Sequence, residues 1–596
     1  MAPHHSHHLS RRPAARRPAP TSAVRQPAAT SQAGADRAVA GSPGSHGAPR
    51  QAPQGSAGRR RVAPVVTTAL VTGLVLTGCA GPGEAGAGGS TPADPTPGGT
   101  LRFALGAAPQ GVDPQQVGSN VSIYVARQLA DSLTDQDPAT GEIEPWLAES
   151  WDVSDDLTHF TFHLRDGVTF SDGSALDSAD VRASFDALAG DLGATAPLAA
   201  SYLAGYERTE APDDRTATVV FDAPNAQFLQ ATSTVSLAIL SEETAQADPA
   251  ERLQGDVVGS GPFVLESYTQ DQGAVLTRRD GYDWAPASAG HEGEAYLDRI
   301  EFSVVPESGV RAGGLASDQF DAVGDVLPQD VPQVEGSGGA VLTRANPGVP
   351  FVLQPNLTRP PLDDVEVRRA LLPAIDRQEL VDTVLSDAFE PATGILASTT
   401  PGYADLSDQL AFDPEEAGRI LDDAGWVPGK DGIRVKDGTP LQIEVTYTPV
   451  FTGSGPVLEL VAQQLRAVGV DLTLRQLAAA EQTTAQDSGD YDLYYYNVTR
   501  ADADILRTQF STAQRNLSLR EPDDVVDPLL DEQLGEADPG ARDALVADAQ
   551  RAILDEGLAV PLFELAQSIG VRGDVHGVTF DASSRLLFHD AWIEQE

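Results

Sequence analysis

The stretch FVLQPNLTRPPLDDVEVRRALLPAIDRQE, residues 351–379, carries the signals that decide the fold. An apolar strand is predicted to end at Asn356, and the Pro360-Pro361 pair predicts an extended link after it. A helix is then predicted to start at Asp363 and Asp364, because acidic residues favour helix N-termini. The apolar positions that follow recur with a helical period: Val367, Ala370, Leu371, Ala374 and Ile375. The stretch therefore predicts a strand, a short extended link and then an amphipathic helix.

The same alternation of strands and helices extends in both directions. Strands are predicted at residues 100–105, 160–164, 216–221, 442–447 and 491–497, and helices at 178–188, 413–425, 456–468 and 541–556. Mixed strands and helices throughout the chain indicate an α/β protein. The sequence shows no internal repeat. A chain of 596 residues is too long for one hydrophobic core, so at least two domains are expected.

Several segments form an ordered set that covers nearly all of residues 100–596. They are PWLAESW (145–151), FTFHLRDGVTFSDG (160–173), SADVRASF (178–185), GSGPFVL (259–265), the block at 356–371 with AIDR (374–377), DPEEAGRILDDAGW (413–426) and VPLF (560–563). In this order the segments resemble the large solute-binding proteins of ABC importers. That family includes oligopeptide-, dipeptide- and nickel-binding proteins.

This resemblance implies an α/β fold with mixed sheets and two lobes that close about a hinge over a bound solute. Lobe I would be built from residues 100–140, 255–344 and 560–596. A small subdomain, residues 141–254, would be inserted in lobe I, and lobe II would be residues 345–559. The resemblance also implies a monomer that captures a peptide or another small organic solute outside the cell. Its partners would be an ABC permease and the associated ATPase.

Residues 59–79, RRRVAPVVTTALVTGLVLTGC, end in the only cysteine of the chain, Cys79. Three arginines, fifteen uncharged residues and small residues before a cut site are typical of an export signal. Fifteen helical residues span roughly 22 Å, less than the ~30 Å hydrocarbon core, so a permanent membrane helix is not expected. Leu-Thr-Gly-Cys resembles the lipobox of bacterial lipoproteins, in which the cysteine is acylated and becomes the N-terminus. The alternative is a chance buried cysteine after an apolar run.

The segments on either side of this signal have biased compositions. Residues 1–58 are rich in Ala, Pro, Arg, Ser and Gly without an apolar period, and are predicted to be disordered. An alternative is a misassigned start, with translation beginning at a non-methionine codon such as that of Val39. Residues 59–78 would be the signal peptide, and residues 79–99 the lipidated cysteine with a flexible linker. The predicted location is the extracellular face of the bacterial cell membrane, held by the lipid alone.

The charge of the chain excludes some partners. The formal charge is −47, and residues 1–78 contain ten arginines against one acid, so the remaining residues carry −56. Such a surface repels phosphate backbones and anionic lipids, which argues against nucleic acid and against electrostatic attachment to a membrane. Acylation of Cys79 would leave no thiol for a disulfide or a thiolate metal site.

The sequence contains none of the common catalytic motifs. G-x-S-x-G, H-E-x-x-H and the phosphate-binding G-x-x-x-x-G-K-[ST] are all absent. Only five histidines follow residue 79, and the two in the strand region, His159 and His163, are expected to be structural. We therefore expect a binding protein with no enzyme activity, no cofactor and no metal site. Two alternatives stay open: a lipid-anchored hydrolase, because so acidic a chain offers many carboxylate pairs, and a lipoprotein that senses a solute without transporting it.

The resemblance implies which residues line the cleft where the segments align without gaps. They come from the loop after Asp113, from the strand near the hinge, and from the strand that starts at Tyr491 with the loop after it. The candidate ligand-binding residues are Ser119, Asn120, Tyr124, Phe351, Gln354, Tyr495, Asn497, Arg500 and Asp502.

The last of these loops departs from the peptide-binding relatives. There a Trp is followed by an Asp that pairs with the α-ammonium group of the peptide, whereas here these positions are Val498 and Ala501. Either the acid has moved to Asp502 or the ammonium anchor is lost. An Arg500 that faces the cleft would suit a carboxylate or phosphate, and the alternative is an Arg500 that is solvated or paired with Asp502. The departure weakens the prediction of a peptide cargo.

Overall fold

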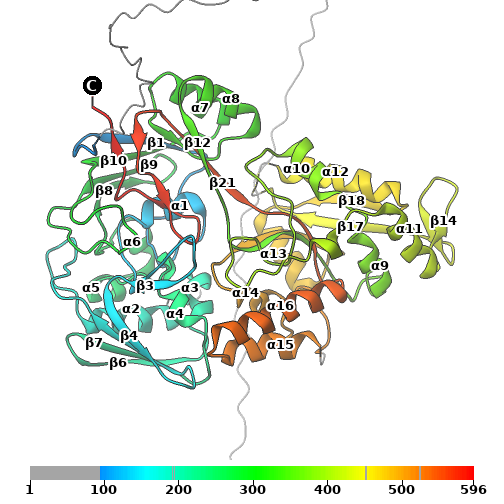
Figure 1. Cartoon of the computed structure of the whole chain (residues 1–596), viewed down its shortest axis with the longest axis horizontal. Coiled ribbons are helices and arrows are strands. Elements are labelled where there is room, and N and C mark those ends of the chain that lie inside the picture. The colour runs from blue at the N-terminus through cyan, green and yellow to red at the C-terminus, as the bar shows by residue number, and fades with distance from the viewer. Residues whose placement is uncertain are drawn as a thin grey trace, which may run out of the picture. The chain divides into compact units, whose positions relative to one another are not determined.

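The computed structural model describes residues 94–595 apart from 191, 194, 450, 452, 523 and 524. The predictions for residues 1–93, including the signal peptide and Cys79, lie outside the described residues. Three larger sheets, together with the helices that cover them, confirm the predicted mixed α/β fold (Figure 1). In the described part of the chain, no helix combines the length and apolar character needed to cross a bilayer.

Lobe I is built on a seven-stranded sheet in the order β12-β21-β11-β1-β10-β9-β8. β1 (Thr100–Leu105) pairs in parallel with β10 (Arg299–Val304) and with β11 (Ala322–Val323), whereas the other pairs are antiparallel. The remaining strands are β8 (Phe263–Thr269), β9 (Gly273–Arg278), β12 (Ala340–Ala345) and β21 (Ala566–Val571). Because β1, β10 and β11 are parallel, their carboxyl ends lie at one edge of the sheet.

Side chains of β1 face two different helical layers. Leu101, Phe103 and Leu105 share a core with α1 (Asn120–Ala126), whereas Ala104 packs with α7 (Ser308–Ala316) and α8 (Val331–Gly336). Successive side chains of a strand point to opposite faces, so this alternation places helices on both sides of the sheet.

The subdomain inserted in lobe I is built on a four-stranded antiparallel sheet in the order β4-β5-β7-β6. Its strands are β4 (Ala148–Val153), β5 (His159–Leu164), β6 (Tyr206–Asp213) and β7 (Thr216–Phe221), and its helices are α2 (Ser178–Ala189), α3 (Pro197–Tyr202) and α4 (Phe228–Ala231). The ring of Phe228 lies within 6.3 Å of the rings of Phe160, Phe162, Phe185 and Phe221. This aromatic cluster gives the subdomain a core of its own.

Lobe II is built on a five-stranded sheet in the order β18-β17-β19-β13-β20. Its strands are β13 (Gly348–Pro355), β17 (Gln442–Tyr447), β18 (Asp471–Gln476), β19 (Leu493–Thr499) and β20 (Val560–Phe563). Its helices are α9 (Val365–Leu371), α10 (Arg377–Val384), α11 (Pro414–Asp423), α12 (Ser454–Ala467), α13 (Ala479–Ser488), α14 (Ile505–Phe510), α15 (Val526–Glu532) and α16 (Pro539–Asp555). They enclose a single large hydrophobic core.

Short elements complete the described chain. In lobe I and its subdomain these are β2 (Thr134–Gln136), β3 (Ile143–Pro145), η1 (Val235–Leu237), α5 (Glu242–Gln246), α6 (Pro249–Leu253) and η2 (Pro328–Asp330). In lobe II they are η3 (Ser407–Leu410), β14 (Val427–Pro428), β15 (Arg434–Lys436), β16 (Thr439–Pro440) and η4 (Gln533–Gly535). The C-terminal segment adds β22 (Val575–His576), β23 (Thr579–Phe580), β24 (Leu586–Leu587) and β25 (Trp592–Ile593).

The stretch at residues 351–379 folds largely as predicted. β13 ends one residue before Asn356, and Asp364 caps α9 by accepting a hydrogen bond from the N–H of Glu366. α9 ends earlier than the apolar pattern predicts, because Pro373 lacks an N–H and disfavours helical geometry at the residue before it. α10 then starts with Asp376 as its cap. The five apolar positions of the pattern are all buried.

Two segments connect the lobes. β12 leads into β13 through Asn346 and Pro347, and β20 leads into β21 through Glu564 and Leu565. The N–H of Asn346 donates to the carbonyl of Leu565 at 2.7 Å, so the two crossovers lie side by side. β20 pairs with β13 in the five-stranded sheet, whereas β21 joins the seven-stranded sheet.

Candidate functional site

A cavity of about 540 Å³ lies where lobe I, lobe II and the crossovers meet. Lobe I contributes residues that follow the carboxyl ends of β1, β10 and β11, and lobe II contributes residues of β13, α10, α12 and β19. Leu565, Ala566 and Gln567 close the cavity at the second crossover. Small-molecule sites in proteins are typically clefts of roughly 300–1,000 Å³, so this cavity has the size of a ligand site.

The wall that lobe II contributes is aromatic. The ring of Phe351 stacks on Tyr495 at 4.9 Å and on Phe563 at 4.7 Å, with interplanar angles of 16° and 22°. Phe389 and Phe451, which also line the cavity, lie 5.6 Å apart. A rigid aromatic surface of this kind contributes a large apolar contact area to a ligand.

The wall that lobe I contributes holds one guanidinium group, that of Arg311. Its three nitrogens donate to the backbone carbonyls of Val305, Pro306, Gly324 and Asp325 at 2.7–2.9 Å. Burial lowers the pKa of Arg311, an effect that the nearby carboxylate of Asp325 opposes. Arg311 therefore fixes the loop after β11 and has little capacity left for a ligand.

Asp325 is the acidic residue among those that line the cavity. Its side chain is open to the cavity, although protein surrounds it on most sides, and no described residue donates a hydrogen bond to its carboxylate. Desolvation raises its pKa, and the charge of Arg311 opposes the rise. A Cβ on Gly106 would lie 2.5 Å from Oδ2 of Asp325, so the carboxylate lies close against the backbone of Gly106. The carboxylate of Asp325 is thus a hydrogen-bond acceptor without a described donor, and it lines the cavity.

A chain of hydrogen bonds joins the two lobes beside the cavity. The hydroxyl of Tyr124 in α1 donates to Oε1 of Gln567, and Nε2 of Gln567 donates to Oδ1 of Asn346 at 2.7 Å. Nδ2 of Asn346 then donates to the hydroxyl of Thr499 in β19 at 2.9 Å. The crossovers are therefore held by side chains from both lobes.

Three of the nine predicted site residues line the cavity: Asn120, Phe351 and Asn497. Asn120 lies in the α1 region and accepts a hydrogen bond from Arg585. Two more lie directly behind the cavity wall, because Tyr124 contacts Gln567 and Tyr495 stacks on Phe351.

Ser119 and Gln354 occupy other positions. Ser119 lies at the N-terminus of α1 and donates to the hydroxyl of Ser122 at 3.0 Å. Gln354 is buried in lobe II, where it accepts from Tyr496 and donates to Ser518. Neither residue lines the cavity.

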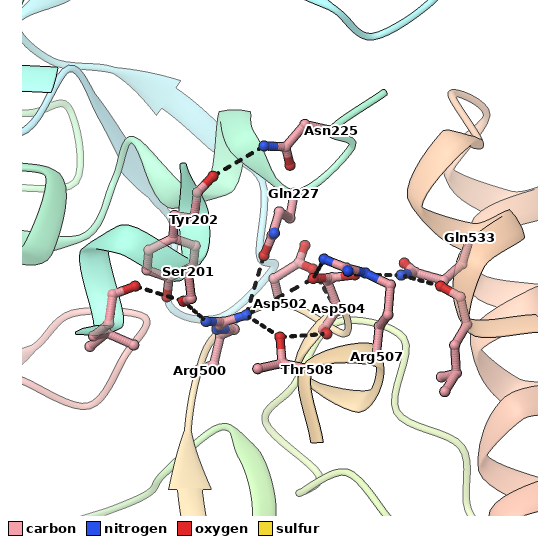
Figure 2. Close-up of polar contacts among 12 residues, drawn as sticks. Ser201, Tyr202, Asn225, Gln227, Arg500, Asp502, Asp504, Arg507, Thr508 and Gln533 are labelled. Atoms are coloured by element: carbon pink, nitrogen blue, oxygen red, sulfur yellow. Dashed lines mark hydrogen bonds and ion pairs between the residues drawn. The ribbon is translucent and has the colours of Figure 1, made fainter. Parts of the chain in front are cut away.

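Arg500 and Asp502 lie in a buried polar cluster outside the cavity lining (Figure 2). Nη2 of Arg500 donates to the hydroxyl of Ser201 at 2.5 Å, and its guanidinium lies 4.4 Å from the ring centre of Tyr202. Asp502 accepts two hydrogen bonds from Arg542, at 2.7 and 2.9 Å. Arg500 thus does not line the cavity, and its described hydrogen bonds go to partners other than Asp502.

The same cluster connects the subdomain to lobe II. Nη1 of Arg500 donates to Gln227 of the subdomain at 3.3 Å and to Thr508 of lobe II at 3.1 Å. A backbone bond from Ala226 to Leu534, 3.0 Å long, adds a second contact between these parts. The lobes therefore touch at a place remote in sequence from the crossovers.

The sequence prediction missed Asp325, Arg311 and Gln567. Asp325 follows β11, and Gly106 and Ala107 follow the parallel strand β1. In sheets with parallel strands, ligands bind outside the carboxyl ends of those strands. An acidic residue two positions after the short apolar strand at 322–323 is the signal that points to Asp325.

Comparison with known proteins agrees with this architecture. The profile of bacterial extracellular solute-binding proteins, family 5 (middle part), matches residues 142–514, which is more than half of the chain. The dipeptide-binding protein of Escherichia coli is 26% identical over 526 residues, covering 83% of this chain and 95% of that protein. The nickel-binding periplasmic protein of the same organism is 25% identical over 493 residues, covering 78% and 91%. Both relatives are named as binding proteins.

Solved structures share the fold. NikA from Brucella suis in complex with Fe(III)-EDTA has a TM-score of 0.72 at 24% identity, covering 83% of this chain and all of that chain. AppA from Bacillus subtilis in complex with a nonapeptide has a TM-score of 0.68 at 18% identity, covering 84% of this chain. These neighbours confirm the predicted two-lobed fold. With the profile matched over most of both lobes and a cavity enclosed between them, this protein belongs to the bacterial extracellular solute-binding proteins of family 5.

Proposed function

We propose that this protein captures a small solute between its lobes outside the cell and delivers it to an ABC permease with its ATPase. The observation that carries the proposal is the cavity of about 540 Å³ lined by both lobes and by the second crossover. A ligand in such a place contacts both lobes only when they are together. It therefore stabilises the closed form by its differential affinity for that form, which the permease can recognise.

The contacts around Arg500 support this mechanism. They join the subdomain to lobe II without lining the cavity, so they stabilise the closed form whichever solute is bound. The paired crossovers at Asn346 and Leu565 supply the short connection about which the lobes would turn. Hinge residues are typically a few positions at the ends of elements, as these are.

The proposed cargo is a small organic molecule with an apolar part and an amine or another strong hydrogen-bond donor. Phe351, Phe389 and Phe451 offer the apolar surface, and Asp325 offers an unpaired carboxylate. Peptides and peptide-like amines have this combination, and the dipeptide-binding relative agrees with it. Asp325 in lobe I would then supply the negative charge that Ala501 does not supply in lobe II.

We also propose that the protein is a lipoprotein. Acylation of Cys79 would hold it at the extracellular face of the membrane, and residues 80–99 would give it reach to the permease. More than one acyl chain is needed for stable anchoring, since each buried methylene contributes about 0.8 kcal/mol.

The test is to identify the solute and measure its binding. Purified protein is denatured, any released small molecule is identified by mass spectrometry, and that compound is titrated by calorimetry and thermal shift. Small peptides, sugars and metal chelates are tested in parallel. We expect amine-bearing compounds to raise the melting temperature, because a ligand at a hundred times its Kd stabilises the fold by about 2.7 kcal/mol. Failure of every compound to shift it, with nothing co-purified, would contradict solute capture.

A further inference from the structure

Two histidines and an aspartate from distant parts of the chain meet in lobe I. His291 lies in the segment between β9 and β10, and His589 and Asp590 lie between β24 and β25. Nδ1 of His291 lies 2.7 Å from Oδ1 of Asp590, and Nδ1 of His589 lies 3.2 Å from the same oxygen. The possible ligand atoms of the three residues all lie within 4.8 Å of one another. Their side chains are only 11–19% exposed.

The hydrogen bond at Nε2, the ring nitrogen that faces away from Asp590, determines the tautomer of each imidazole ring. Nε2 of His291 lies 2.9 Å from the carbonyl oxygen of Glu294, and Nε2 of His589 lies 2.9 Å from that of Gly293. A carbonyl oxygen only accepts, so both Nε2 atoms carry the proton. In the neutral rings both Nδ1 atoms are then unprotonated and point their lone pairs at Oδ1 of Asp590.

The carboxylate is fixed in the same way. The N–H of Gly290 donates to Oδ2 of Asp590 at 2.8 Å, which leaves Oδ1 turned toward the two rings. Three electron-pair donors therefore face one another at hydrogen-bond distance, so a cation, either a proton or a metal ion, has to lie between them. The rings also stack 4.2 Å apart at an angle of 15°, so placing a proton on each Nδ1 would bring two positive charges face to face.

We propose that His291, His589 and Asp590 bind a divalent transition-metal ion, with Zn²⁺ as the probe, and leave a fourth position for water. Imidazole nitrogen and carboxylate oxygen are preferred ligands of Zn²⁺, and three protein ligands with one open position is a common arrangement. Ligating histidines usually donate their other N–H to a carbonyl or carboxylate, as both rings do here. None of the three residues lines the cavity between the lobes, so this site is separate from the cargo site.

A metal at this point would connect the C-terminal segment to the loop before β10. The ligands are 298 residues apart in sequence, and each lies in a segment without long strands of its own. Binding of the metal to the folded state alone would therefore stabilise the packing of both segments on lobe I. No sequence pattern predicts this site, because its two histidines are not near one another along the chain.

The test measures Zn²⁺ bound by the full-length chain in which His4, His5, His7 and His8 are replaced by alanine. After treatment with EDTA and dialysis, bound Zn²⁺ is measured by elemental analysis, and Co²⁺ is used as a coloured substitute. We expect one Zn²⁺ per chain, a higher melting temperature with Zn²⁺, and reversal by EDTA. His291→Gln should lose this ion, and Asp590→Asn should weaken the Kd by about 10-fold or more.

His163→Gln is the matched control. His163 also pairs with an aspartate, Asp152, at 3.0 Å, but on the surface and without a second histidine. The His163→Gln variant should bind Zn²⁺ as the parent chain does. If the parent binds no more Zn²⁺ than His291→Gln, or if the Co²⁺ spectrum is the same in the parent and in Asp590→Asn, the metal site is refuted. Should His291→Gln fail to fold, as judged by circular dichroism, the Asp590→Asn comparison decides alone.

Discussion

Arg500 of lobe II and Ser201 of the inserted subdomain are joined by a hydrogen bond of 2.5 Å across 299 residues of sequence. The guanidinium is buried, and its other bonds reach Gln227 and Thr508. The bond therefore exists only while the subdomain and lobe II are in contact. It makes Arg500 a direct reporter of lobe closure.

Arg500→Met should weaken cargo binding, although Arg500 does not contact the cargo. Hydrogen bonds to charged groups contribute about 1.5–3 kcal/mol, so we expect a 10- to 100-fold loss of affinity that is equal for chemically different cargoes. Calorimetry with two cargoes measures the loss, and small-angle scattering should show a more open ensemble. The matched control is Arg507→Met, since Arg507 binds Asp504 within lobe II at 2.7 and 2.9 Å. A loss restricted to one cargo would instead place Arg500 in contact with it.

Asp325→Asn should stabilise the cargo-free protein and weaken binding of amine-bearing cargo. Desolvation raises the pKa of Asp325 in the folded state, so stability falls as pH rises from the unfolded pKa through the folded one. The variant should lose that decrease, which thermal melts between pH 4 and about pH 8 can detect. Asp271→Asn is the control, because Asp271 is an exposed residue that shares the positive φ of Asp325, 63° against 51°. If Asp325→Asn bound the cargo with unchanged affinity, the proposal that this carboxylate contacts the cargo would be wrong.

Arg542→Met should be strongly destabilising. It leaves Asp502 buried without its partner, which typically costs about 3–5 kcal/mol. Burial alone would raise the pKa of Asp502, but the charge and hydrogen bonds of Arg542 outweigh burial and lower it. The pair therefore contributes stability above the unfolded pKa, and this stability is lost as pH falls through the lower folded pKa.

The control for this pair lies on the same helix. Arg551 and Asp548 of α16 form an exposed ion pair at 2.7 Å, for which we expect a change of about 0–1 kcal/mol in Arg551→Met. Urea unfolding at pH 7 and at acidic pH measures both variants. If both substitutions lowered the free energy of unfolding by the same amount, the burial of Asp502 would not explain the contribution of its ion pair to stability.

Cys79→Ala should release the protein from the membrane. The substitution removes the only thiol that acylation can use, so the chain should appear in the culture medium while its cargo affinity is unchanged. Fractionation with immunoblotting measures the release, and mass spectrometry of the parent detects the lipid. Ser90→Ala in the linker serves as the control. Retention of Cys79→Ala on the membrane would point to another means of attachment.

The fold could be predicted where local signals are strong. The strand at residues 100–105 and the caps Asp364 and Asp376 follow from alternation and from acidic residues before apolar runs. The sheet that β20 joins could not be predicted, because β20 and β21 are separated by only two residues yet lie in different sheets. Which sheet a short buried strand joins depends on its tertiary partners and not on its own sequence.

The site could be predicted only in part for the same reason. Asn120, Phe351 and Asn497, which the family resemblance proposes, line the cavity. The partners of Arg500 and Asp502, Ser201 and Arg542, could not be predicted because they are provided by other parts of the fold. A charged residue near a cleft can either contact the ligand or belong to a buried polar cluster behind the cleft. Only the packing of the folded chain distinguishes these two roles.

The position of β21 has a consequence for how the chain is made. β21 lies between β12 and β11 in the sheet of lobe I, although it is formed by residues 566–571, and three of its residues line the cavity. Lobe II is continuous and can fold as soon as its sequence has emerged from the ribosome, since domains generally fold as units during synthesis. Lobe I must wait for almost the last residue. A nascent chain can therefore neither complete lobe I nor enclose a solute between the lobes before residues 566–571 have emerged from the ribosome.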